Sequence, residues 1–240
     1  MAQKINLSIV LPVYNEEKNI PLIAQNYSSF KNSITTELIL VEDGGSTDNT
    51  RQEIVKISKK NPLVKPLFTH QKGYGVSIYN GLKAAKGEYL CWTHADLQTD
   101  LQDTIKAYRL IKKQSNPQTC LVKGSRHNRP FSDSIFTLGM SIIETLLLKT
   151  FLHDINAQPN LFHRNFLKLL KNPPTDFSFD LYSYYIAKKN KYQIIKFPVL
   201  FTQRLHGQSH WNINFSEKWK FIKRTFDYSL KLKQRIQNEI

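Results

Sequence analysis

Acidic side chains follow three segments that have the pattern of buried strands. Glu16, Asp43 and Asp96 each stand at or just after the end of an apolar run. Each residue alone is typical of a turn or a helix cap. In an open sheet of parallel strands, however, ligands bind at the edge where the carboxyl ends of the strands meet. Three acidic residues that reach this edge in chain order therefore predict a ligand-binding site there.

Two glycines, Gly73 and Gly75, lie in the segment 72–76, just before a predicted helix. Glycine lets the backbone approach a ligand closely, so this turn is a second candidate for the binding site. The segment lacks the Gly-Lys-Ser/Thr of a P-loop, and no GxGxxG follows the first strand. The sequence therefore carries neither a Walker motif nor a dinucleotide-binding fingerprint.

The elements that must position these residues alternate between strand and helix. The segment 5–13 is a continuous apolar run, as a buried parallel strand requires. Further strands are predicted at 37–43, 64–70, 88–93 and 119–124. Between them, helices are predicted at 16–30, from a capping box at Thr50, at 77–86 with Gly87 as its stop, and from a capping box at Thr99 to 114. This alternation is typical of an α/β fold with a parallel sheet and helices on both faces.

The second half of the chain has a different pattern. The apolar segment 134–152 carries Glu144 and Lys149, which suits a helix on a core or a membrane surface. Strands are predicted at 159–164 and 192–203, with a helix at 179–190 between them. From residue 216 onward the tail is a basic amphipathic helix whose apolar positions recur at spacings of three and four: Trp219, Ile222, Phe226 and Leu230. We expect one domain over residues 1–210 and an amphipathic helix over 211–240.

The order of the motifs resembles family 2 glycosyltransferases. The motifs are PVYNE, VEDGGSTDNT, KGYGVSIYNGLKAAKGEY, HADLQTD and GSR, followed by an Arg-x-x-Gly-x-Ser element that starts at Arg204. The resemblance is strongest to the branch of dolichyl-phosphate mannose synthases and polyprenyl-phosphate glycosyltransferases, and it covers residues 5 to about 210. It implies a GT-A fold.

The resemblance also implies roles for individual residues. A nucleotide diphosphate sugar would be bound by Pro12, Tyr14, Glu16, Asp43, Gly73 and Ala95. Asp96 and Gln98 would hold a divalent metal, Mn²⁺ or Mg²⁺, which neutralises the charge that develops on a diphosphate leaving group. Arg126 and Arg204 would face phosphate groups, for which the guanidinium fork is well suited. Asp96, Arg126 and Arg204 are thus expected to act in catalysis.

The sequence departs from the family pattern at His94, where the metal motif usually has a second aspartate. A histidine at this position can still reach the metal, and it would favour Mn²⁺ over Mg²⁺. It can also bond the nucleotide instead, or mark a loss of metal dependence. A second departure is at 153–159, where only Asp154 matches the Asp-x-x-Ser-Gly-Phe of this branch, so the acceptor is left open.

The expected function is transfer of a hexose from a nucleotide diphosphate sugar to a polyprenyl phosphate or another lipid-linked acceptor at a membrane surface. A phosphate acceptor is already an anion and needs little help from a base. One alternative is a soluble transferase that acts on a sugar hydroxyl and requires a base, for which Asp180 is the candidate; Asp180 can equally serve as a charge at a helix N-terminus. Another is a nucleotide-sugar-binding protein without activity.

The composition limits the remaining possibilities. A net charge of +15 favours anionic partners, but the aromatic residues are not interleaved with basic ones as in nucleic-acid-binding modules, so no nucleic acid is expected. No uncharged apolar stretch is long enough to span a bilayer. The first residues lead into a strand without the layout of a signal peptide, and two cysteines provide no disulfide framework. We expect a cytoplasmic location, with peripheral contact to the inner face of the cytoplasmic membrane.

Overall fold

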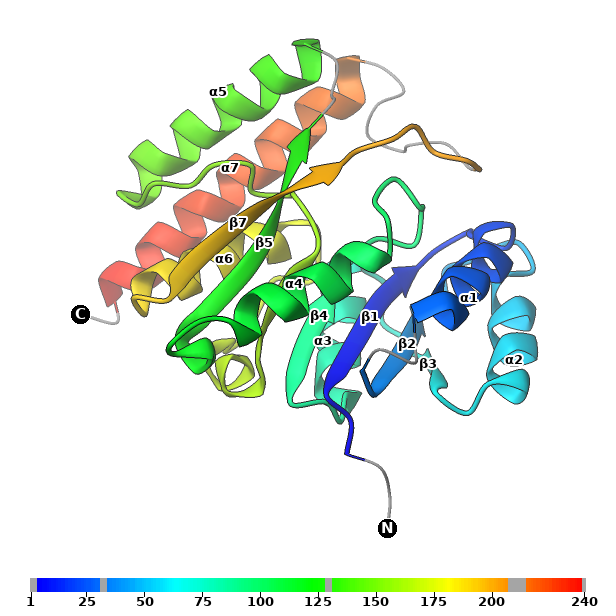
Figure 1. Cartoon of the computed structure of the whole chain (residues 1–240). Coiled ribbons are helices and arrows are strands. Elements are labelled where there is room, and N and C mark those ends of the chain that lie inside the picture. The colour runs from blue at the N-terminus through cyan, green and yellow to red at the C-terminus, as the bar shows by residue number, and fades with distance from the viewer. Residues whose placement is uncertain (1–3, 31–33, 128–130, 207–214, 239–240) are drawn as a thin grey trace.

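Seven strands form a single, mostly parallel sheet in the computed structural model (Figure 1). The structure describes residues 4–30, 34–127, 131–206 and 215–238. The order across the sheet is β3-β2-β1-β4-β6-β5-β7. The bounds are β1 (Leu7–Val13), β2 (Thr36–Glu42), β3 (Val64–Phe68), β4 (Tyr89–Trp92), β5 (Cys120–His127), β6 (Asn160–His163) and β7 (Gln193–Leu200).

One strand runs against the others. β6 pairs antiparallel with both β4 and β5, whereas β1, β2, β3 and β4 are mutually parallel and β7 is parallel to β5. Every strand that the sequence predicts is present, and the expected α/β fold with a mostly parallel sheet is confirmed. The antiparallel β6 separates a parallel N-terminal part of the sheet from the β5–β7 pair.

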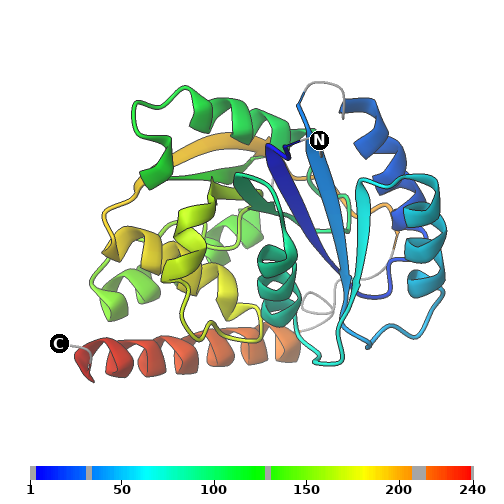
Figure 2. The same ribbon diagram turned by 90° about the horizontal axis from the view of Figure 1, so that it is seen from below.

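Helices cover both faces of the sheet (Figures 1 and 2). They are α1 (Asn19–Phe30), α2 (Thr50–Lys60), α3 (Tyr74–Ala84), α4 (Gln102–Lys112), α5 (Phe131–Leu148), α6 (Ser178–Lys189) and α7 (Phe215–Asn238), with short 3-10 helices η1 (Pro117–Thr119) and η2 (Arg164–Leu169).

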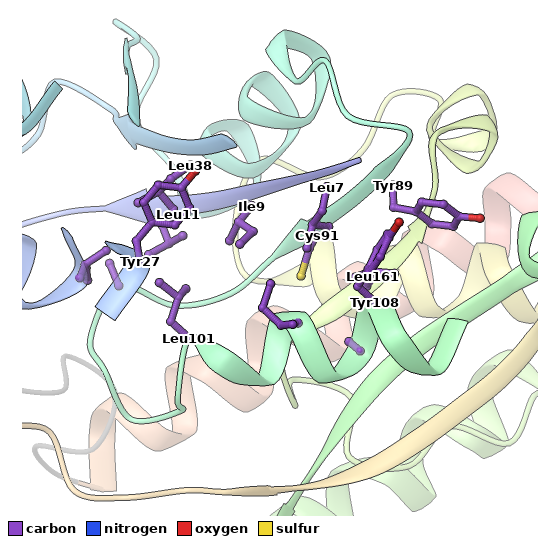
Figure 3. Close-up of a cluster of buried hydrophobic side chains, with 14 of the residues drawn as sticks. Leu7, Ile9, Leu11, Tyr27, Leu38, Tyr89, Cys91, Leu101, Tyr108 and Leu161 are labelled. Atoms are coloured by element: carbon purple, nitrogen blue, oxygen red, sulfur yellow. The ribbon is translucent and has the colours of Figure 1, made fainter. Parts of the chain in front are cut away.

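The side chains of β1 show why the sheet is buried on both faces. Leu7, Ile9 and Leu11 lie in one core together with apolar residues of α1 and α4 (Figure 3). Val10 lies in the other core, with residues of α3 and α6. Successive side chains of a strand point to opposite faces, so a strand covered on both sides needs a continuous apolar run.

The helix predicted from Thr50 does start there, as α2, but the capping boxes predicted at Thr50 and Thr99 and the stop predicted at Gly87 are wrong. Thr50 and Thr99 do not cap α2 and α4, because the helices have no side-chain cap at their start. Asp48 and Asp100 instead accept hydrogen bonds from the backbone of Thr50 and of the residue that begins α4. Gly87 does not end α3; its N–H donates to the side chain of Ser8 at 2.7 Å. These positions serve tertiary contacts that a local pattern does not reveal.

The C-terminal helix α7 packs against α5 and α6. Its buried positions are Thr225, Ser229 and Leu232, whereas Phe226 and Leu230 are 38% and 37% exposed. The apolar stripe that the sequence predicts therefore does not face the core at these two positions. Figure 2 shows α7, in red, along the outer side of the molecule. The boundary predicted at residue 210 falls within 207–214, outside the described residues, and stays a prediction.

Among the described residues, no helix is both long enough and apolar enough to cross a membrane.

Candidate active site

The carboxyl ends of β1, β2 and β4 form the predicted site edge. Pro12 pairs with Val41 near the ends of β1 and β2, and Val10 pairs with Trp92 at the end of β4. The loops that leave these parallel strands carry the three acidic residues found in the sequence. The sheet therefore brings together segments that are more than 50 residues apart in the chain, as between Asp43 and Asp96.

Asp43 joins two loops of this edge. Its Oδ1 accepts a hydrogen bond from the N–H of Gly45 at 2.9 Å, and its Oδ2 accepts one from the N–H of Gly73 at 3.0 Å. The half-exposed ring of Tyr14 lies beside Gly45, where an added Cβ would come 3.1 Å from the ring. Tyr14 and Asp43 are thus neighbours on an accessible surface, an arrangement that suits the binding of a base and a ribose.

The glycines before α3 accommodate the protein's own backbone. A Cβ on Gly73 would lie 2.4 Å from the carbonyl of Thr175, and one on Gly75 would lie 2.3 Å from the carbonyl of Pro174. Gly75 also donates its N–H to Thr175 at 2.9 Å. The close approach inferred from these glycines is therefore to the loop before α6; contact of Gly73 with a nucleotide sugar stays a prediction.

Glu16 stands in an environment that disfavours its charge. Burial raises its pKa to about 7, and the nearby carboxylates of Asp96 and Asp48 add to this effect, whereas a hydrogen bond from Asn19 and the charge of Arg204 oppose it. The Asn19 amide donates to Glu16 at 2.5 Å. A carboxyl group with such a pKa can donate as well as accept a hydrogen bond near neutral pH.

The two residues predicted to bind a metal share one cationic partner. The guanidinium of Arg204 lies 3.0 Å from Asp96 Oδ2 and donates through Nε to Gln98 Oε1 at 3.3 Å. Gln98 is held in turn by its side-chain amide, which donates to the carbonyl of Thr202 at 3.0 Å. Asp96 Oδ2 and Gln98 Oε1 therefore both face the positive charge of the Arg204 guanidinium. Carboxylate and amide oxygens are also ligands that suit a hard divalent ion.

The ring of His94 lies beside Tyr74. Its ring centroid is 5.8 Å from that of Tyr74, and within the described residues the ring makes no hydrogen bond. The part of the chain that the structure describes holds no group of three His, Cys, Asp or Glu side chains arranged for a metal. Coordination by His94 stays a prediction, as does contact of the buried Ala95 with the donor.

Asp180 is buried beneath the site with both oxygens occupied. Trp92 Nε1 donates to Oδ1 at 2.9 Å, and the Tyr74 hydroxyl donates to Oδ2 at 3.0 Å. The side chain is 2% exposed and stands in the first turn of α6. This geometry favours a structural role for Asp180 over that of a base, because a base must reach the proton that it removes.

Arg126 is fixed by Asp154. The backbone N–H and the Nε–H of Arg126 each donate to the Asp154 carboxylate at 2.9 Å, and a terminal guanidinium nitrogen bonds it as well. Burial works against ionisation of Asp154, but the charge and hydrogen bonds of Arg126 outweigh it and hold the pKa of Asp154 below its usual range. A phosphate that binds Arg126 would have to share it with this carboxylate.

Sequence reasoning gave no role to several residues that build this site. Tyr74 lies inside the glycine motif, yet the sequence drew attention only to its glycines. It stacks on Phe177 with ring centroids 4.5 Å apart, and its hydroxyl accepts a hydrogen bond from the Gln158 amide. Lys123 could have been singled out from the sequence, because it is a charged residue within the largely apolar strand β5.

Comparison with known proteins places this geometry in context. The model of glycosyl transferase family 2 matches residues 8–189. A dolichyl-phosphate beta-glucosyltransferase of Trichomonas vaginalis is 27% identical over 184 residues, which is 70% of this chain and 56% of the relative. A dolichol-phosphate mannosyltransferase of Pyrococcus furiosus is 24% identical over 212 residues, 85% of this chain and 59% of the relative. The chain thus spans less than two thirds of the length of both relatives.

Solved structures share the fold. Glucosyl-3-phosphoglycerate synthase of Mycobacterium tuberculosis, in complex with Mn²⁺, UDP and glucosyl-3-phosphoglycerate, superposes with a TM-score of 0.72 at 14% identity over 95% of this chain and 80% of that chain. A mannosyltransferase of Pyrobaculum calidifontis, in complex with GDP-Man and Mn²⁺, gives a TM-score of 0.63 at 18% identity over 92% of this chain and 61% of that chain. The expected GT-A fold is thereby confirmed.

Proposed function

The chain belongs to glycosyl transferase family 2, and from this premise we propose that it transfers a hexose from a nucleotide diphosphate sugar to a polyprenyl phosphate. The observation that carries the proposal is the convergence of Asp43, Asp96 and Arg204 on one edge of the sheet. Relatives that match most of this chain are named as dolichyl-phosphate or dolichol-phosphate transferases, which supports a polyprenyl phosphate acceptor.

On this proposal, the residues divide the donor between them. Tyr14 and Asp43 bind the base and ribose, with Pro12 and Glu16 beside them. Asp96 Oδ2 and Gln98 Oε1 are the oxygens that would hold Mn²⁺ or Mg²⁺, which when bound neutralises charge on the diphosphate leaving group. Structures with this fold contain Mn²⁺ together with UDP or GDP-Man, and this supports a divalent ion here.

Arg204 is the residue that would serve phosphate. Its guanidinium has a planar set of donors that match phosphate oxygens and stays charged at any physiological pH. In the present structure these donors are directed at Asp96 and Gln98. Arg126 is the second candidate, and its guanidinium is oriented by Asp154. A phosphate acceptor is already ionised, so no base is required.

We place the acceptor at a membrane surface because of two neighbouring helices. Exposed apolar side chains lie on α5 and on α7, which pack together: Leu138, Ile142, Ile143 and Leu146 of α5, and Phe226 and Leu230 of α7. Lys223 and Lys231 are exposed on α7 near the last two. Apolar residues that insert between headgroups, beside lysines that attract anionic lipid, favour a peripheral position on the inner face of the cytoplasmic membrane.

A transfer assay with matched lipids tests the proposal. The protein would be incubated with Mn²⁺ and radiolabelled nucleotide sugars, one at a time, with either a polyprenyl phosphate or the same polyprenol without its phosphate. We expect label in the lipid phase with the phosphate only, and none with Asp96→Asn. A third reaction would contain an oligosaccharide as the acceptor, and transfer to its hydroxyl groups equal to that on the polyprenyl phosphate would favour the alternative of a soluble polysaccharide transferase. Donor binding without transfer to any acceptor would indicate a binding protein.

A further inference from the structure

Strand β5 holds the segment 154–160 from three of its positions. Lys123 reaches it through its side chain, Gly124 donates its N–H to the carbonyl of Pro159 at 2.9 Å, and Arg126 binds Asp154. Gly124 has no room for a side chain, because a Cβ would lie 2.2 Å from the carbonyl of Gln158. The segment is thus fitted closely against this one strand.

Lys123 binds the segment at three different residues. Its Nζ donates to the carbonyls of Ile155 and Ala157, both at 2.6 Å, and to Asn160 Oδ1 at 3.1 Å. An ammonium group has three N–H donors, so these acceptors use all of them. The side chain is fully buried and has no carboxylate within ion-pair distance among the described residues. Lys123 therefore cannot touch a substrate, and its charge is balanced by carbonyl dipoles.

The segment that Lys123 holds carries two groups of the site. At one end, Asp154 orients the guanidinium of Arg126. Toward the other end, Gln158 donates to the hydroxyl of Tyr74, which in turn donates to Asp180. A lysine that fixes the backbone between these two side chains sets the position of both.

We propose that Lys123 is a positioning residue for the acceptor side of the site, acting through the segment 154–160 on Arg126 and Tyr74. This inference rests on the proposed function for its effect on transfer, but its structural part stands independently. A misplacement of about 1 Å in a binding group can cost about 100-fold in rate. Asp96 is held by Arg204, and Asp43 is held by the backbone N–H groups of Gly45 and Gly73 rather than by the side chain of Tyr74, so both donor residues would keep their positions.

The test compares Lys123→Met with Lys196→Met. Lys196 is a matched control because its ammonium group also lies near the Tyr184 ring, at 5.6 Å against 5.5 Å for Lys123, but donates to the carbonyl of His153, outside the segment 154–160. For Lys123→Met we expect about a 100-fold loss in kcat/KM for the polyprenyl phosphate with unchanged donor affinity. Lys196→Met is expected to retain transfer.

A spectroscopic measurement tests the positioning directly. The side-chain Nε–Hε signal of Arg126 in a ¹H–¹⁵N spectrum, assigned by its loss in Arg126→Lys, reports the hydrogen bond to Asp154. We expect this signal to shift or broaden in Lys123→Met and to stay unchanged in Lys196→Met. Asn160→Ala removes one acceptor of Lys123 without removing the charge, and it should shift the same signal less.

The outcomes separate this inference from the proposed function. A folded Lys123→Met protein with an unchanged Arg126 signal would overturn the inference, and so would equal losses of transfer in both lysine variants. If Lys123→Met does not fold, the signal in Asn160→Ala decides in its place. If the wild-type protein transfers to no acceptor, the proposed function fails, while the Arg126 signal still tests the role of Lys123.

Discussion

At the scale of single residues, each arginine assigned to phosphate is paired with a carboxylate. Arg204 lies on Asp96 and Arg126 on Asp154. Such pairs keep a guanidinium oriented before its ligand arrives, and they also make the carboxylate a competitor for it. At Asp96 the competition involves a metal as well, because the oxygen that faces Arg204 is the one assigned to the divalent ion.

Arg204→Met should therefore bind Mn²⁺ more tightly than the wild type in the absence of nucleotide. Removal of a positive charge 3.0 Å from Asp96 leaves its carboxylate free for the ion, and we expect a gain of about tenfold, or about 1.4 kcal/mol. Free Mn²⁺ would be titrated by electron paramagnetic resonance. Arg126→Met, which removes the same charge beside Asp154 instead, is the control. Weaker Mn²⁺ binding in Arg204→Met would contradict the shared site.

Asp180→Asn tests whether this residue supports the structure or acts as a base. The substitution removes the charge that accepts hydrogen bonds from Trp92 and Tyr74, and it replaces one of the two accepting oxygens with an NH₂ group, which can only donate. We expect unfolding in urea to require about 1.5–3 kcal/mol less, with transfer to polyprenyl phosphate retained below the transition. A protein of unchanged stability that has lost all transfer would show instead that Asp180 acts as a base.

At the scale of elements, the contact between α5 and α7 contains a buried acidic residue. Glu144 of α5 is fully buried, one of its oxygens bonds Ser229 of α7, and the other has no partner among the described residues. Burial raises the pKa of Glu144 to about 7, although the hydrogen bond from Ser229 acts in the opposite direction. An isolated buried carboxylate is costly once it ionises.

Glu144 should thus make the protein less stable as the pH rises. Its pKa is higher in the folded than in the unfolded chain, so the folded state binds more protons between pH 4.5 and about 7, and stability falls across this range. Glu144→Gln should reduce this fall and raise stability at pH 8 by about 1–3 kcal/mol. Chemical denaturation of both proteins at pH 5 and pH 8 measures the fall in stability with pH and the gain in Glu144→Gln. Glu16→Gln is a useful comparison, because burial also raises the pKa of Glu16, which lies at the sheet edge and not between α5 and α7. No gain for Glu144→Gln at pH 8 would contradict the interpretation.

The exposed side of α7 can be tested without disturbing its buried side. Phe226→Ser with Leu230→Ser changes only exposed apolar residues, whereas removal of 216–240 would also uncover the core beneath Leu232. We expect the double variant to lose flotation with anionic liposomes at low salt while its melting temperature stays unchanged. High salt should release the wild type, because attraction to lysines is screened. Flotation of the variant equal to that of the wild type would remove α7 from the membrane contact.

At the scale of the whole molecule, the donor loops link distant parts of the sheet. Asp43 connects the loops after β2 and before α3, and Arg204 connects the segment after β7 to the loop after β4. A ligand that binds these loops should stabilise the fold as a unit, because it binds the folded chain alone.

A donor screen by thermal unfolding measures this linkage. The correct nucleotide sugar, with Mn²⁺ and at 100 times its dissociation constant, should stabilise the fold by ~2.7 kcal/mol, which corresponds to a rise of about 5–10 °C in the melting temperature. Asp43→Asn should lose most of this rise, since its NH₂ group replaces one of the two oxygens that accept from the N–H groups of Gly45 and Gly73, and the carboxylate charge is lost for the ribose. An equal rise in the variant would exclude Asp43 from the donor site.

Much of the fold could be predicted because local sequence patterns indicate most of its strands and helices. The continuous apolar run at 5–13 identified β1, since a strand buried on both faces has little room for polar residues. The edge strands β3 and β7 are partly exposed and carry lysines. The motif order placed Glu16, Asp43 and Asp96 on one edge, because the carboxyl ends of parallel strands share that edge. The direction of β6 had no such signal, since four residues buried in a sheet look alike in either direction.

The partners of the site residues were decided only by tertiary structure. Asp180 meets Trp92 and Tyr74 across 88 and 106 residues of chain, and Arg204 meets Asp96 across 108. The exposed position of Phe226 follows from how α7 packs on α5. A sequence determines which side chains are available and which element each stands on. Which of them touch depends on how the elements pack, and that packing is a property of the whole chain rather than of any segment.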